Sequence, residues 1–345
     1  MPITATSFGT IADQEITAFT LQNDSGMLVK ILDYGGIISE LHTPGRNGSA
    51  DVVLGYDSLA GYIPNPAYMG AIVGRFANRI QGAQFTLNGV TRHLDANEPP
   101  NHLHGGFHGF HTHRWQAEPY IDQKDFCLRL TRRSPDGEGG YPGNLDAVVI
   151  YRLSADNTLV FDITAISDQD TPVSITQHSY FNLAGHDSGD ICGQQLHIYA
   201  NTITESDNAL LPTGRILPVA GTPFDFNSLA AINPNHPDLV SGYDVNYVVS
   251  GIPGILRPAA KLHDPKSGRT LKISTTKPGI QLYDGTHLTA LQIAGKNNTR
   301  YPKWGGLCLE TQHFPDAVNQ PEFPSPILKA GEQYSHTTVF SFDVV

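Results

Sequence analysis

Two segments of the sequence place an ionisable side chain at the end of an apolar or β-branched run. Glu310 follows Leu307–Leu309, so we expect its carboxylate to be partly desolvated and its pKa to be raised. His178 follows Val173–Thr176 and precedes aromatic residues that can stack on a ligand. A carboxylate and an imidazole are a common pair for general acid–base catalysis. Taken singly, however, Glu310 is equally typical of a solvated strand end and His178 of a structural histidine.

The segment Val73–Ile80 contains two arginines, Arg75 and Arg79. A guanidinium group is a bidentate donor that suits a carboxylate, a phosphate or paired hydroxyl groups. On this segment alone, arginines in surface ion pairs are the simpler interpretation.

Five histidines lie within a dozen residues, namely His102, His104, His108, His111 and His113. Imidazole is a common zinc ligand, so this histidine run suggests a metal site. No Asp or Glu follows it at ligand spacing, and a structural zinc site needs four ordered ligands, so we predict no bound metal. His104 is best suited to a ligand site, because the two glycines after it let the backbone approach a ligand closely.

The composition disfavours several classes of function. A formal net charge of −11 and a pI near 5.7 argue against a nucleic-acid partner. The chain has no Gly-x-Ser-x-Gly elbow, P-loop or dinucleotide fingerprint. No apolar run approaches the roughly 20 residues of a membrane helix, so we predict no membrane partner.

The cysteines and the N-terminal residues give evidence about the cellular compartment of the protein. Cys127, Cys192 and Cys308 stand far apart among apolar neighbours and are expected to be buried free thiols. Met1–Thr6 lacks the basic and apolar regions of a secretory signal. These features favour a cytoplasmic protein, although a processed periplasmic or secreted form would look the same.

Alternation with a period of two dominates the chain and predicts strands rather than helices. Gln84–Leu87 and Val90–Leu94 flank Asn88-Gly89, the dipeptide best suited to a type I′ hairpin turn. Further strands are expected at residues 27–32, 126–131, 146–153, 159–166, 247–250, 271–274 and 337–342. Short helical turns are expected at residues 58–62 and 228–232. The 34 glycines and 24 prolines suit short strands joined by tight turns.

These strands indicate an all-β fold in which antiparallel sheets pack face to face. No linker or strand–helix alternation divides the chain, so we interpret residues 1–345 as one domain. The polar, glycine-rich loops 96–115 and 134–145 are expected at the sheet surface, where functional sites are commonly built.

The segments around Arg79, His104, His178 and Glu310, taken together and in this order, closely resemble the galactose mutarotase (aldose 1-epimerase) family. The resemblance extends over nearly the whole chain. Further matching segments are Asp51–Tyr56, Gly140–Leu145, Leu211–Gly214, Gly221–Phe226, Gly242–Asp244 and the tail from Asn319 to Thr338.

The resemblance implies a large antiparallel β-sandwich, the supersandwich of this family, with a groove for one monosaccharide. It implies an enzyme that interconverts the α and β anomers of free hexoses such as galactose and glucose, without a cofactor or metal, as a monomer or homodimer. By motif position, Glu310 is similar to the family's general base, His178 to its general acid, and His104 to a histidine that assists at the reacting end of the sugar. The implied sugar-binding residues are Asn78, Arg79, His104, Tyr180, Asp244 and Gln281. Arg75 lies in the arginine motif but is not assigned to substrate.

For this chemistry we expect a neighbouring carboxylate to keep His178 protonated, and burial to raise the pKa of Glu310. One departure from the family pattern concerns the histidine run. After Gly105-Gly106 the family commonly has Gly-Phe-Asp-Lys and a tryptophan, whereas in this chain Gly109-Phe110 is followed by His111-Thr112-His113-Arg114-Trp115. The extra histidines leave the pH profile and adventitious metal binding open.

Three other interpretations stay open from the sequence. A non-catalytic sugar-binding module would keep the fold, but a lectin has no need of an acid–base pair. A hexose-phosphate epimerase would need basic residues in the groove beyond Arg75 and Arg79. A cupin-like metalloenzyme would use the histidine run.

Overall fold

The computed structural model describes residues 3–63, 65–239 and 242–345. These residues form β-strands and short 3₁₀ helices and contain no α-helix, which confirms the predicted all-β class. None of the described helices has the length and apolar character needed to cross a membrane. Met1 and Pro2, which belong to the segment from which the absence of a signal was inferred, lie outside the described residues.

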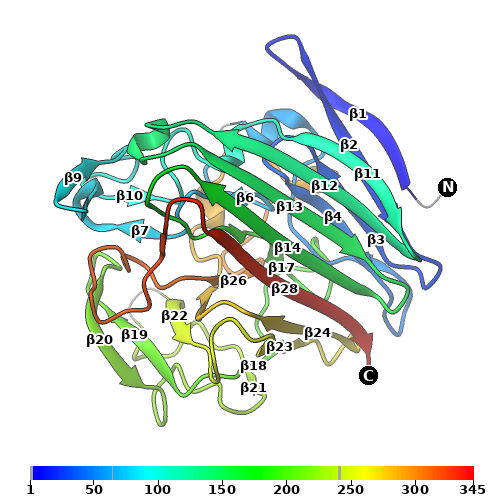
Figure 1. Ribbon diagram of the computed structural model, residues 1–345. Helices are drawn as coiled ribbons and strands as arrows, with labels where there is room; N and C mark the ends of the chain where they lie inside the picture. Colours follow the sequence, from blue (N-terminus) through cyan, green and yellow to red (C-terminus); the bar gives the residue numbers. More distant parts are fainter. Residues whose placement is uncertain (1–2, 64, 240–241) are drawn as a thin grey trace.

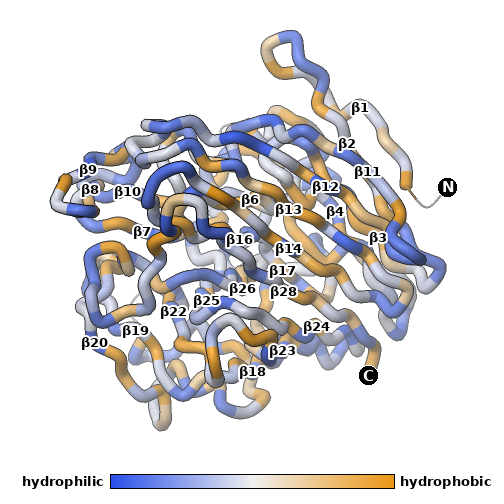
Figure 2. Tube along the Cα trace, in the orientation of Figure 1, coloured by the Kyte–Doolittle hydropathy of each residue, from blue (hydrophilic) through white to orange (hydrophobic). Residues whose placement is uncertain are grey.

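A nine-stranded antiparallel sheet forms the broad front face in Figure 1. In spatial order its strands are β11 (Gln116–Asp122), β12 (Asp125–Ser134), β13 (Leu145–Leu153), β14 (Thr158–Ser167), β28 (Gln333–Val344), β24 (Arg269–Thr275), β23 (Arg257–His263), β18 (Gln195–Ile198) and β21 (Ala230–Ala231). Every second residue of β13 is buried, because successive side chains of a strand point to opposite faces. Figure 2 shows hydrophobic residues along much of β13 and β14.

A six-stranded antiparallel sheet carries four of the eight predicted site residues, namely Tyr180, Asp244, Gln281 and Glu310. Its strands, in spatial order, are β17 (Tyr180–Phe181), β26 (Leu307–Gln312), β25 (Gly279–Tyr283), β22 (Asp244–Val248), β19 (Thr202–Ser206) and β20 (Pro212–Pro218). The register places Cys308 opposite Tyr180 and Glu310 opposite Gln281. Strand β26 is buried along its whole length.

The remaining elements are a five-stranded sheet, four strand pairs and six short helices among the described residues. The five-stranded sheet consists of β1 (Ile3–Ile11), β2 (Gln14–Gln22), β3 (Leu28–Leu32), β4 (Ile38–Thr43) and β5 (Ala50–Asp51), and its β1–β2 hairpin projects from the body in Figure 1. The strand pairs are β6 (Ile72–Val73) with β16 (Thr176–Gln177), β7 (Arg79–Ile80) with β10 (His102–Leu103), β8 (Gln84–Leu87) with β9 (Val90–His93), and β15 (Thr171–Pro172) with β27 (Ile327–Leu328). The helices are η1 (Leu59–Tyr62), η2 (Gln81–Ala83), η3 (Phe110–Thr112), η4 (Glu138–Gly140), η5 (Leu288–Ala290) and η6 (Lys296–Asn298).

One large hydrophobic core joins the sheets. It includes Val149 and Phe161 from the nine-stranded sheet and Leu282 and Leu309 from the six-stranded sheet. The side chain of each is at most 2% exposed. Burying each such side chain contributes about 1.5–3 kcal/mol. Sheets that meet over a shared apolar layer form a sandwich, as predicted.

Most of the predicted elements are confirmed. The hairpin of β8 and β9 turns through Asn88 and Gly89, both with positive φ, as a type I′ turn requires. The helical turn predicted at residues 228–232 is wrong, because Ala230–Ala231 pairs with β18 as an edge strand, and sheet pairing overrides local propensity there. The strand expected at residues 247–250 lies earlier, at β22.

The burial of the cysteines was predicted correctly for two of the three. Cys127 and Cys308 are buried, but Cys192 is exposed. Cys192 lies outside the strands, in a loop where its apolar neighbour Ile191 is buried instead.

Candidate active site

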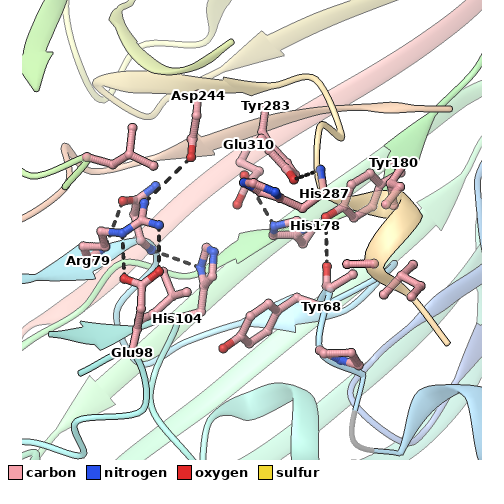
Figure 3. A pocket seen from close by; sticks show the side chains of 18 residues that line it. Tyr68, Arg79, Glu98, His104, His178, Tyr180, Asp244, Tyr283, His287 and Glu310 are labelled. Atoms are coloured by element: carbon pink, nitrogen blue, oxygen red, sulfur yellow. Dashed lines mark hydrogen bonds and ion pairs between the residues drawn. The ribbon is translucent and has the colours of Figure 1, made fainter. Parts of the chain in front are cut away.

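A cavity of about 320 Å³ opens beside β26 (Figure 3). All predicted site residues except Gln281 line it, namely Asn78, Arg79, His104, His178, Tyr180, Asp244 and Glu310. They come from β7, β17, β22, β26 and the loops next to β7, β10 and β16, so residues far apart in the sequence meet at one place. Of the two loops predicted to carry sites, 96–115 reaches the cavity and 134–145 does not.

Glu310 projects from the middle of β26 and is only 2% exposed. Burial raises its pKa well above the usual value, and the negative charge of Asp244 adds to this, while Arg79 acts in the opposite direction. Its Oε1 lies 3.6 Å from Nε2 of His178. Its Oε2 is buried and has no hydrogen-bond partner among the described residues. This oxygen therefore has an unused hydrogen-bonding position beside the cavity that Glu310 lines.

His178 lies between β16 and β17 and is fixed through its backbone. Its N–H donates to the carbonyl of Ala71 and its carbonyl accepts from the N–H of Gly70, both at 2.9 Å. Burial lowers the pKa of the ring to about 4. The expectation that a carboxylate would keep His178 protonated is thus wrong, because burial also favours the uncharged form of its neighbour Glu310.

His104 and Asn78 hold each other in place across β7 and β10. The N–H of His104 donates to the carbonyl of Asn78, and the N–H of Asn78 donates to Nδ1 of His104, each at 3.1 Å. Because Nδ1 accepts this bond, a neutral His104 carries its hydrogen on Nε2. Burial, with smaller effects of His178 and Arg79, lowers the pKa of His104 well below its usual value. His104 is therefore a neutral N–H donor on the cavity wall.

The two glycines after His104 do not serve a ligand, contrary to the prediction. A Cβ on Gly105 would lie 1.8 Å from the carbonyl oxygen of Gly74, and one on Gly106 would lie 2.8 Å from Asp95. Both residues have positive φ. They let the loop turn tightly against neighbouring protein and so set the position of His104.

Arg79 is held between two carboxylates, as Figure 3 shows. Its Nε and Nη2 donate to the two oxygens of Glu98 at 2.7 and 2.8 Å, and its Nη1 lies 3.8 Å from Oδ2 of Asp244. Burial alone would lower the pKa of Arg79, but Glu98 and Asp244 outweigh it and the pKa is raised. The guanidinium is a fixed, charged donor.

Gln281 lies behind Asp244 rather than on the cavity wall. Its Nε2 donates to Oδ1 of Asp244 at 2.6 Å, and its Oε1 is buried without a partner among the described residues. Burial raises the pKa of Asp244, whereas Arg79 and Gln281 lower it. This hydrogen bond orients the Asp244 carboxylate. A contact between Gln281 and a ligand stays a prediction.

Arg75 does not reach the cavity. Its guanidinium is 2% exposed and donates to the Ser134 hydroxyl and to the carbonyls of Ser134, Pro135 and Pro142, each at 2.9 Å. Burial lowers its pKa to about 10. The surface ion-pair interpretation is wrong for Arg75, which ties together buried loop backbone.

Comparison with known proteins points to one family. The family model described as Aldose 1-epimerase matches residues 17–341. The chain is 43% identical over 331 residues to galactose mutarotase from Bos taurus (95% of this chain, 94% of that protein), and 35% identical over 337 residues to aldose 1-epimerase from Escherichia coli K12 (95% and 96%). The structure also superposes on galactose 1-epimerase from Lactobacillus acidophilus, with a TM-score of 0.86, 27% identity, and coverage of 99% of this chain and 98% of that one. The chain belongs to the aldose 1-epimerase family.

The family resemblance did not reveal several residues of the cavity wall. Glu98 comes from the loop before β10, and Tyr68 packs against both His104 and His111 with ring centroids 4.6 Å apart. Tyr283 and His287 close another side. A proline-flanked glutamate such as Glu98 carries no sequence signal for its role, because its partner Arg79 is 19 residues away and reaches it only through the pairing of β7 with β10.

The histidine run does not gather into a metal site. Only His104 of the run lines the cavity, and the two ring nitrogens of His102 are bonded to the Asp95 carbonyl and the Tyr141 hydroxyl, both at 2.7 Å. His104, His178 and Glu310 are close enough to share an ion. However, Nδ1 of His104 accepts a hydrogen bond, whereas the second nitrogen of a metal-bound histidine ordinarily donates one.

A second acidic group is neutralised by lysines. Glu40, His42 and Asp51 also lie within reach of one ion. Nζ of Lys296 is 2.5 Å from Oδ2 of Asp51, and Lys30 pairs with Glu40. Lysine ammonium groups therefore occupy the positions where an ion would bind.

Proposed function

We propose that this protein is an aldose 1-epimerase that interconverts the α and β anomers of free hexoses such as galactose and glucose. The observation that carries the proposal is the pair of Glu310 and His178, whose nearest atoms lie 3.6 Å apart on one cavity wall. Membership of the family and the names of its relatives support the same reaction.

The reaction requires one base and one acid close together. A hemiacetal opens when a base takes the proton of the C1 hydroxyl and an acid gives a proton to the ring oxygen, after which the ring bond breaks. Both oxygens are bonded to C1, so the two protein groups must lie near each other. In our proposal Glu310 accepts the proton through Oε2 and His178 supplies one from Nε2. Each group contributes about 10²–10⁴-fold to the rate.

The pKa directions favour the intermediate of this mechanism. After ring opening Glu310 has gained a proton and His178 has lost one, so both are uncharged. Burial favours these same uncharged forms. The aldehyde then rotates about C1–C2, and the two proton transfers run in reverse. No step calls for a metal or cofactor.

The other cavity residues have separate proposed roles. The Nε2 hydrogen of His104 would donate to O1 while charge develops there. Arg79 and Asp244 would hold hydroxyl groups at the far end of the sugar, and Tyr180 would pack on its face. Holding that end while C1 rotates limits loss of the open-chain form.

The charge of the cavity disfavours a phosphorylated substrate. Among the described residues, Arg79 is the one arginine that lines the cavity, and no lysine lines it. The guanidinium of Arg79 already contacts Glu98 and Asp244. Two carboxylates would repel a phosphate. A binding module is disfavoured because it would have no use for the buried acid–base pair.

Polarimetry of freshly dissolved α-galactose and α-glucose tests the proposal. We expect rapid equilibration with both hexoses, and a panel of pentoses and hexose 6-phosphates measures the specificity. Rates at the uncatalysed level for every free aldose would refute the proposal.

Three expectations from the sequence stay predictions. They are that residues 1–345 form one domain, that the protein is cytoplasmic, and that it is a monomer or homodimer.

A further inference from the structure

One face of strand β26 contacts both ring nitrogens of His178. Cys308 and Glu310 are two residues apart on this strand, so their side chains point to the same side. The Cys308 Sγ lies 3.5 Å from Nδ1 of His178, and Oε1 of Glu310 lies 3.6 Å from Nε2. The strand therefore places a thiol at one ring nitrogen of His178 and a carboxyl group at the other.

Cys308 is the hydrogen-bond partner that the described residues offer to Nδ1 of His178. Besides Cys308 and Glu310, the ring packs against Tyr180 and His104, each at 5.2 Å between ring centroids. Cys308 is fully buried, and burial raises the pKa of its thiol well above the usual value, so the sulfur is uncharged. A neutral thiol sulfur is a weak hydrogen-bond acceptor.

We propose that Cys308 is a positioning residue whose sulfur accepts the Nδ1 hydrogen of His178, so that the catalytic proton moves only at Nε2. The inference rests on the proposed function, since it concerns the acid of the same reaction. During ring opening the Nε2 proton passes to the ring oxygen while Glu310 takes the O1 proton, and ring closure reverses both transfers. The hydrogen on Nδ1 stays in place throughout.

The neutral sulfur explains why this acceptor is a thiol rather than a carboxylate. A carboxylate on Nδ1 would stabilise the imidazolium and raise its pKa. Burial lowers the pKa of His178 to about 4, and the uncharged Cys308 adds no charge that would oppose this, so the protonated ring readily gives up its proton. The strand orients His178 without making it a weaker acid.

Two substitutions separate hydrogen bonding from packing. Cys308→Val keeps a similar volume but has no acceptor, whereas Cys308→Ser keeps an acceptor oxygen. We expect C308V to lower kcat about tenfold, the effect of losing one neutral hydrogen bond, with KM little changed. C308S should restore kcat to within about threefold of the wild type. Cys127→Val, in a buried position of β12 away from the cavity, is the matched control for loss of a thiol and should keep wild-type kcat.

The tautomer of His178 provides a test that does not depend on activity. In ¹⁵N-histidine-labelled protein, with the His178 signals assigned by their loss in His178→Ala, we expect wild-type Nδ1 to be protonated and Nε2 to be unprotonated above pH 6. C308V should show a mixture of the two tautomers. Thermal unfolding of each variant reports whether the fold is kept.

The outcomes distinguish this inference from the proposed function. Protonation of Nε2 in the wild type, or wild-type kcat in C308V, would overturn the role of Cys308. If the wild type equilibrated no aldose, the proposed function would fail, and the spectra would still decide how Cys308 and His178 are bonded.

Discussion

Oε1 of Glu310 lies 3.6 Å from Nε2 of His178, while Oε2 of the same carboxyl group is buried without a partner among the described residues. One oxygen is therefore close to the imidazole, and the other has an unused hydrogen-bonding position. Burial drives both groups toward their uncharged forms. The pair therefore holds one proton, and these pKa directions place it on the carboxyl group of Glu310.

Substitution of either member of this pair should remove most of the activity. We expect Glu310→Gln and His178→Ala each to lower kcat by about 10²–10⁴-fold, because each removes one general acid–base group. KM should change little, since sugar hydroxyls are bound elsewhere in the cavity. The measurement is polarimetry of fresh α-galactose. Glu118→Gln, an exposed position on β11, controls for loss of a carboxylate. Near-normal rates in either cavity variant would remove the assignment.

The pH dependence of kcat/KM should be bell-shaped, because the pair must carry one proton. Below about pH 4 His178 also becomes protonated and no base is left. Above the raised pKa of Glu310 neither group has a proton to give. Asp244 raises the pKa of Glu310 through its charge, so Asp244→Asn should move the alkaline limb to lower pH. Glu98→Gln should leave that limb in place, and a limb that fails to move in D244N would contradict this account.

The sequence was sufficient to single out Glu310 and His178 but not to predict their pKa shifts. Glu310 and His178 could be found because each follows a run of strand residues, and the order of motifs matched a family. The protonation of His178 was predicted wrongly, because its pKa is set by burial in the folded chain, which the sequence alone does not show. The part played by Glu98 was missed for a similar reason, since its contact with Arg79 depends on the pairing of β7 with β10.

The parts of the fold that depend on residues close together in the sequence were predictable. Alternation located β13 and β14, and Asn88-Gly89 located the hairpin between β8 and β9. The order of strands was not predictable, because β28 from the end of the chain inserts between β14 and β24. Short edge pairings such as β21 also escape prediction, since two alanines carry no β signal of their own.

Glu98 should affect binding more than chemistry. Its two oxygens hold the guanidinium of Arg79, so Glu98→Gln should free Arg79 and raise KM about tenfold, as loss of a charge-assisted hydrogen bond would. The value of kcat should fall less, because the acid–base pair is untouched. Glu138→Gln breaks a similar bidentate pair with Arg132 outside the cavity and is the matched control. Equal KM values for E98Q and E138Q would show that Glu98 does not position Arg79.

Chelation should leave activity unchanged. His104 is the member of the potential ion site that disfavours a metal, because its Nδ1 accepts the Asn78 N–H and its Nε2 therefore carries the hydrogen. We expect dialysis against EDTA to keep the mutarotation rate within error, and added Zn²⁺ not to increase it. A rate that falls on dialysis and returns with one divalent ion would establish a metal requirement.

Lys277 should make the folded state less stable at neutral pH than at alkaline pH. The side chain is fully buried, its Nζ contacts the Tyr334 hydroxyl, and burial lowers its pKa well below the usual value. The unfolded chain therefore binds one more proton than the folded chain, so the contribution of Lys277 to the free energy of unfolding rises with pH up to the unfolded pKa near 10.4.

Lys277→Met tests this sign. The variant should be more stable than the wild type at pH 7, by about 2 kcal/mol, and the difference should shrink as the pH rises toward 10. The stabilities of the variant and the wild type should be compared between pH 7.5 and 9.5. In this range the neighbouring His313 and His336 stay neutral in both the folded and the unfolded chain. Urea unfolding at several pH values measures it. A difference in stability that is constant with pH would mean that Lys277 keeps its proton in the folded protein.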